Sequence, residues 1–209
     1  MNKNKVLEAE REFLSLYPRG FDSVEMQQIK KKHNTQKLHE YYLNAFNKTN
    51  FDNIDKIIEE MIKVVQKSSM VSLFEKPKFR DYLRSLSYDD KELLVEGLYS
   101  LLFENQEIGF NQMLFVLQDG KLAKWTIIST FLYYSAPSTE VFLKPTTVKE
   151  IIRILEIDSL TYNPKPSYKF YVEFRKIINE IKTLWGNKLG NDNAGITGVL
   201  MIILPSLSS

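Results

Sequence analysis

The segment from Lys144 to Lys149 combines residue types that bind anions at the start of a helix. Pro145 suits a first helical turn, and Thr147 followed by Glu150 has capping-box spacing, so we expect a helix to begin here. The free N–H groups and positive dipole end of such a helix attract phosphate or carboxylate groups. The residues expected to bind the anion are Lys144, Thr146, Thr147 and Lys149. The alternative is that Thr147 only caps the helix and the lysines are solvated.

A second basic group lies around the proline-rich segment 162–167 and the helix expected after it. Its members are Lys165, Lys169, Arg175 and Lys176. If these side chains and the lysines of the first segment face one way, they could lie along the phosphate backbone of a nucleic acid. The alternative is a solvated helix face over an aromatic core, with two ion pairs at i,i+4 spacing. These pairs would be Lys169 with Glu173 and Lys176 with Glu180.

A third basic run, from Lys30 to His33, closes another expected helix. Cations at a helix C-terminus interact favourably with the helix dipole, so a structural role is sufficient. The run is the next candidate for an anion or nucleic-acid contact if the residues near 144–176 do not bind.

Several kinds of chemistry are excluded by the residues that the chain lacks. It has no cysteine, which removes disulfides, thiolate nucleophiles and cysteine-ligated metals. The only two histidines, His33 and His39, are six residues apart, which places them on different faces of a helix. The phosphate-loop, dinucleotide-binding and serine-hydrolase motifs do not occur. We therefore expect no bound metal and no cofactor, whereas a catalytic pair among the 26 acidic residues stays open.

The elements that must position these residues are helices. Apolar residues recur every three or four positions along nearly the whole chain, and strict apolar–polar alternation is almost absent. The clearest stripe predicts a helix over 53–67 with Asp52 at its start, and another long helix follows Ser167. The segment 122–136 is apolar on most sides, which predicts a central, buried helix. Gly97, inside an expected helix, indicates close packing against a neighbour.

The fold class is therefore all-α, with residues 1–209 forming one multi-helix array. The linker 137–145, with a proline at each end, is the candidate boundary of a C-terminal helical subdomain. The chain has no repeat of fixed period, which is the pattern that would indicate a solenoid.

Charge and hydropathy restrict the possible binding partners less than the missing residue types restrict the possible chemistry. The net charge is +2, and the sequence pI of about 8.5 lies below the value typical of dedicated DNA-binding domains. The longest apolar stretches, 122–136 and 194–204, are shorter than a membrane span, and no secretory segment occurs in the first thirty residues. We expect no membrane partner and a cytoplasmic location.

Four strings in the chain resemble an all-helical family of bacterial proteins whose function is not established. They are Leu16-Tyr17-Pro18-x-Gly20-Phe21, Lys31-Lys32-His33, Lys144-Pro145-Thr146-Thr147-Val148-Lys149 and Tyr162-x-Pro164-x-Pro166-Ser167. The resemblance spans most of the chain and implies a bacterial, cytoplasmic setting, but no activity, ligand or site residue.

These observations favour a non-catalytic interaction module that binds nucleic acid or a protein partner. The alternative is an enzyme whose site is assembled only by the fold and acts on a phosphate-bearing or other anionic ligand near 144–149.

Overall fold

The computed structural model describes residues 1–190, 192–203 and 205–206. Helices cover well over half of these residues and no strand occurs among them, which confirms the all-α prediction. The α-helices are α1 Lys3–Leu16, α2 Val24–His33, α3 Thr35–Ala45, α4 Ile54–Lys67, α5 Glu75–Ser85, α6 Tyr88–Phe103, α7 Gln106–Asp119, α8 Trp125–Ser135, α9 Pro145–Ile154, α10 Tyr168–Trp185 and α11 Asn193–Ile203. Position 204, the last residue of the apolar stretch 194–204 that predicts a C-terminal helix, lies outside the described residues.

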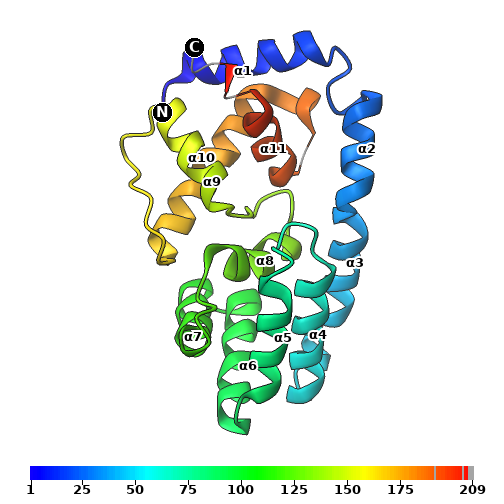
Figure 1. The fold of residues 1–209 in the computed structure, drawn as a ribbon, viewed down its shortest axis with the longest axis vertical. Helices are drawn as coiled ribbons and strands as arrows, with labels where there is room; N and C mark the ends of the chain where they lie inside the picture. Colours follow the sequence, from blue (N-terminus) through cyan, green and yellow to red (C-terminus); the bar gives the residue numbers. More distant parts are fainter. Residues whose placement is uncertain (191, 204, 207–209) are drawn as a thin grey trace.

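The helices form two groups that meet at α8 (Figure 1). Helices α3 to α7 stand side by side in one group, and α1, α9, α10 and α11 form the other. Helix α2 runs along one edge of the second group and continues into α3 through Asn34, whose left-handed backbone (φ 51°) breaks the helix. Within the described residues, no helix is both long enough and apolar enough to cross a membrane.

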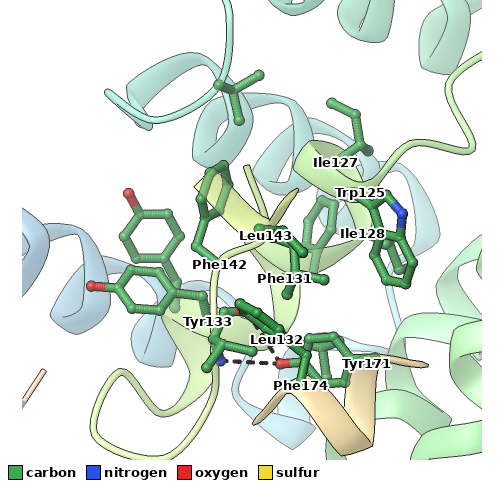
Figure 2. Close-up of a cluster of buried hydrophobic side chains, with 14 of the residues drawn as sticks. Trp125, Ile127, Ile128, Phe131, Leu132, Tyr133, Phe142, Leu143, Tyr171 and Phe174 are labelled. Carbon is green, nitrogen blue, oxygen red and sulfur yellow. Dashed lines mark hydrogen bonds between the residues drawn. The ribbon is translucent and has the colours of Figure 1, made fainter. Parts of the chain in front are cut away.

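Helix α8 is the centre of the core, as its all-round apolar sequence predicted. Every residue from Ile127 to Tyr134 is buried. Its side chains pack against the loop that follows it and against α10 (Figure 2). The contacting residues include Phe131, Leu132 and Tyr133 of α8, Phe142 and Leu143 of the loop, and Tyr171 and Phe174 of α10. Residues 140–143 of the loop 136–144, where we placed a candidate subdomain boundary, are thus buried in the core, and the boundary stays a prediction.

Local signals place most helix starts to within a residue or two. Ser87 caps α6 by accepting the Asp90 N–H (3.1 Å), as its spacing predicts. Helix α4 begins at Ile54 and is capped by Asn53, so Asp52 as the cap was wrong by one position. Either residue type accepts a hydrogen bond from the first turn, so the sequence alone does not separate them.

Helices α6 and α7 make the closest approach in the array. A Cβ atom on Gly97 would lie 3.0 Å from the side chain of Met113 on α7, which confirms the predicted close packing. Gly109, which we did not single out, is tighter still. A Cβ there would lie 2.1 Å from the Leu101 amide nitrogen and 2.5 Å from the Gly97 carbonyl oxygen.

Replacing Gly109 by alanine should therefore lower the free energy of unfolding by about 2 kcal/mol, because the two helix backbones must separate. The matched control is Gly198→Ala in α11, where a Cβ would meet nothing within 4 Å. That change should raise stability by about 0.5 kcal/mol through helix propensity. Urea denaturation of both variants measures the difference, and equal midpoints would contradict the close packing of α6 and α7.

Candidate functional site: a cleft between α2, α9 and α11

A cavity of about 500 Å³ opens between α2, the start of α9 and α11. Its floor and walls are mainly apolar, and three methionines give them adaptable surfaces. The apolar lining includes Phe21, Met26, Ile29, Met70, Phe142, Val148, Phe174, Leu189, Val199, Met201 and Ile202. We call this cavity the α2–α11 cleft.

The α2–α11 cleft stays open because α11 presents small residues to it. Ala194, Gly195 and Gly198 all line the cavity. A Cβ on Gly195 would lie 2.9 Å from the ring of Phe21, which covers that glycine, whereas a Cβ on Gly198 would enter unfilled space. A larger residue at 198 would therefore occupy volume that the cleft now offers to a ligand.

Basic residues line the cleft from two separate parts of the chain. Lys30, Lys32 and His33 line the cleft from the last turn of α2, and Lys144 lines it from the position before α9. The Nδ1 atom of His33 lies 2.8 Å from the Ser69 hydroxyl, which joins the end of α2 to the segment after α4. An anion entering the cleft would thus meet cations from two separate parts of the chain.

The single carboxylate among the described lining residues is Asp192, and it already has partners. It accepts hydrogen bonds from the Tyr133 hydroxyl (2.7 Å) and the Ala194 N–H (2.8 Å). Burial and the neighbouring Asp192 carboxylate raise the pKa of Tyr133 far above its usual value, so this hydroxyl stays protonated and donates. Asp192 therefore helps to start α11 by accepting the Ala194 N–H.

The loop that carries Phe142 and Lys144 into the cleft is fixed by a buried carboxylate. Glu140 accepts hydrogen bonds from Arg175 (2.6 Å) and from the Tyr171 hydroxyl (2.6 Å). The same hydroxyl accepts the Val141 N–H at 3.2 Å, and Figure 2 shows it pointing at the loop. Because Glu140 is 8% exposed, these bonds replace water around its charge and hold the loop in one position.

The start of α9 differs from the predicted capping box. The helix begins at Pro145 with Lys144 at the cap position, so Thr147 already lies inside the first turn. Its hydroxyl donates to the Met201 sulfur (3.4 Å), and Glu150 pairs with Arg153 (2.8 Å) instead of reaching back. No side chain caps this helix, so its first N–H groups face the surroundings of Lys144 without a side-chain acceptor.

The structure brings only part of the predicted site together. Lys144 and Thr147 line the α2–α11 cleft with Lys30, Lys32 and His33, whereas Thr146 is exposed beside it. Lys149 lies over the ring of Tyr162, 5.0 Å from its centroid.

The basic residues near α10 are placed elsewhere. Lys165 and Lys169 are exposed, on or next to the start of α10, and the loop before α10 follows the edge opposite α2 (Figure 1). Arg175 is held by Glu140 and by Gln106 (2.9 Å), so it is structural. The expected i,i+4 pairs were wrong, because Lys176 pairs with Glu173 at i,i+3 and Glu180 pairs with Lys3.

The sequence reasoning missed the α11 wall of the cleft. We interpreted residues 190–193 as a polar turn and the residues after them, Gly195 and Gly198 included, as an apolar core helix, with no cavity beside it. The signal available was two glycines three residues apart inside an apolar helix, where glycine costs stability unless space is needed. Among the described residues, no group of three or more His, Asp or Glu side chains could hold a metal ion.

Comparison with known proteins found no matching family model, no matching curated protein and no matching solved structure. The α2–α11 cleft is therefore the feature from which a function can be inferred.

Replacing Glu140 by glutamine should lower the free energy of unfolding by about 3 kcal/mol, because the largely buried Arg175 would lose its charge partner. The control is Glu173→Gln, which breaks the exposed pair with Lys176 and should leave the denaturation midpoint nearly unchanged. Similar midpoints for the two variants would show that the Glu140 pair does not hold the loop.

Proposed function

We propose that the protein is a non-catalytic binding module that takes an amphipathic anion in the α2–α11 cleft. Such a ligand has an apolar chain or ring and ends in a carboxylate or phosphate group. The observation that carries the proposal is a mainly apolar cavity of about 500 Å³ that is also lined by lysines from two separate parts of the chain. Small-molecule sites have this character, with hydrophobic walls and a few convergent polar groups.

The apolar part of the ligand would lie along α11 and the floor of the cleft. Gly198 leaves room there, and Met201 and Ile202 are 50% and 38% exposed, so a ligand would remove apolar surface from water. The anionic group would lie near Lys144, where the uncapped first turn of α9 adds N–H donors. This retains the contact with a phosphate-bearing or other anionic ligand expected at 144–149 and adds an apolar part to that ligand.

A binding role is favoured over catalysis because of the groups that face the cleft. Among the described lining residues, Asp192 is the one carboxylate, and two hydrogen bonds already engage it. His33 is bonded to Ser69 at the cleft edge. General acid–base catalysis needs groups free to exchange protons with a bound substrate. An enzyme would bind the same anionic ligand in the cleft. It would also need a reaction to catalyse, and neither Asp192 nor His33 indicates one.

Nucleic acid and protein partners remain proposals with less support. The basic residues expected to follow a phosphate backbone are divided between the cleft, Tyr162, internal ion pairs and the surface of α10. A cytoplasmic location and a bacterial origin are likewise proposals, based on the sequence.

We expect dodecanoate and dodecyl phosphate to bind more tightly than dodecanol in calorimetric titrations below the micelle concentration. Lys144→Gln should weaken dodecanoate binding about tenfold, because one charge-assisted contact contributes about 1.5 kcal/mol. Gly198→Leu should abolish binding of all three by filling the cavity. The matched control, Lys169→Gln, removes an exposed lysine outside the cleft lining and should change nothing.

Equal affinity of the wild type and Gly198→Leu for dodecanoate would exclude the α2–α11 cleft as the site. Equal affinity for dodecanoate and dodecanol would exclude the anion contact. Salt-sensitive binding of DNA or RNA oligonucleotides, with no binding of dodecanoate, would instead favour the nucleic-acid proposal.

A further inference from the structure

The segment between α4 and α5 carries the most exposed large apolar side chains in the described chain. Leu73 is 79% exposed and Phe74 is 83% exposed. Two adjacent side chains of this size, both almost fully in water, form an apolar projection that no other described residue covers. We call Leu73 and Phe74 the apolar tip.

The apolar tip is held in a fixed conformation by Ser72. The Ser72 carbonyl oxygen accepts the N–H groups of Glu75 (3.0 Å) and Lys76 (3.3 Å), and its hydroxyl accepts the Phe74 N–H (3.2 Å). The tip is therefore an ordered turn directly before α5. A preordered apolar surface loses little conformational freedom when it binds.

The surroundings of the apolar tip are cationic. Ser69, four residues before Leu73, lies 2.8 Å from His33, so the last turn of α2, which carries Lys30–Lys32, meets the beginning of this segment. Lys76 and Lys78 follow the tip in α5. The one nearby acid in this stretch, Glu75, is paired with Lys124 at 3.1 Å.

We propose that the apolar tip docks on an anionic phospholipid surface. Leu73 and Phe74 enter the boundary between headgroups and acyl chains, and the lysines around them contact anionic headgroups. Apolar insertion combined with basic residues is how proteins without a spanning helix bind lipid surfaces. Our expectation of no membrane partner came from the length of the apolar stretches, which determines spanning and not surface binding.

The position of the apolar tip also relates it to the proposed function without depending on it. Ser69 and Met70, in the same segment, line the α2–α11 cleft. Docking by this segment would bring the cleft next to the lipid layer, where amphipathic anions accumulate. The proposal therefore goes beyond ligand binding and names the surface at which the ligand would be exchanged.

The test is sedimentation of the full chain with vesicles, with no dodecanoate present. We expect binding to vesicles of phosphatidylcholine mixed with phosphatidylglycerol, and much weaker binding to phosphatidylcholine alone or at high salt. Leu73→Ser with Phe74→Ser should reduce binding about tenfold or more. The matched control is Ile108→Ser with Phe115→Ser on α7, which removes two side chains that are 56% and 63% exposed and should leave binding unchanged.

Tryptophan fluorescence of two single variants measures insertion into the lipid layer independently. The two native tryptophans, Trp125 and Trp185, are 1% and 2% exposed, so lipid does not reach them. Phe74→Trp should show a blue shift of its emission on addition of anionic vesicles, and the control Phe115→Trp should not.

Three results would overturn the proposal: no binding to anionic vesicles at low salt, equal loss of binding in the α7 control, or an equal blue shift for Phe115→Trp. Loss of self-association in the Leu73→Ser and Phe74→Ser variant would instead show that a second copy of the chain covers the tip. Because no ligand is added, these outcomes are separate from those that test the α2–α11 cleft.

Discussion

The position of the buried Glu140 carboxylate is the constraint on which the arrangement of the two helix groups depends. Removing a carboxylate from water is costly unless partners replace its hydration, and here they come from distant segments. Arg175 and Tyr171 of α10 donate to it, and Gln106 at the start of α7 donates at 3.3 Å. Its backbone oxygen also accepts from Asn193 of α11 at 3.2 Å. Glu140 can be buried only when α7, α10 and α11 are all in place.

The same constraint explains why an irregular loop can cross the core. Backbone groups of a buried loop need hydrogen-bond partners that regular structure would otherwise supply. The Tyr171 hydroxyl takes the Val141 N–H, and the Ser129 hydroxyl on α8 takes the Leu143 N–H at 3.0 Å. These two hydroxyl groups thus accept the loop N–H groups, as carbonyl groups of a neighbouring strand would in a β-sheet. With the loop fixed, Phe142 becomes a rigid part of the cleft floor, and Lys144 starts α9 at the cleft edge.

The sequence predicts the local part of this architecture well and the long-range part poorly. The stripes of α4 and α8 depend only on helical periodicity, so both helices and the burial of α8 were predictable. Lys144 and Thr147, which line the cleft, were also singled out from the local sequence as candidates for anion binding. The wall of the cleft that α11 forms was not predictable, because nothing in the sequences of α2 and α11 shows that the two helices face each other. Arg175 has the pattern of a surface cation, and only the fold reveals Glu140 beside it.

Helix α2 has few buried contacts because one of its faces borders the cleft. Met26 is the single buried residue of this helix, while Ile29 is 43% exposed toward the cavity. Helix α2 is therefore held mainly by Met26, by its junction with α3, and by the contact between His33 and Ser69. Elements with few buried apolar contacts open at low free-energy cost. A ligand that fills the space between Ile29 and α11 would supply the apolar contacts that α2 lacks, so binding would stabilise this helix more than any other part of the chain.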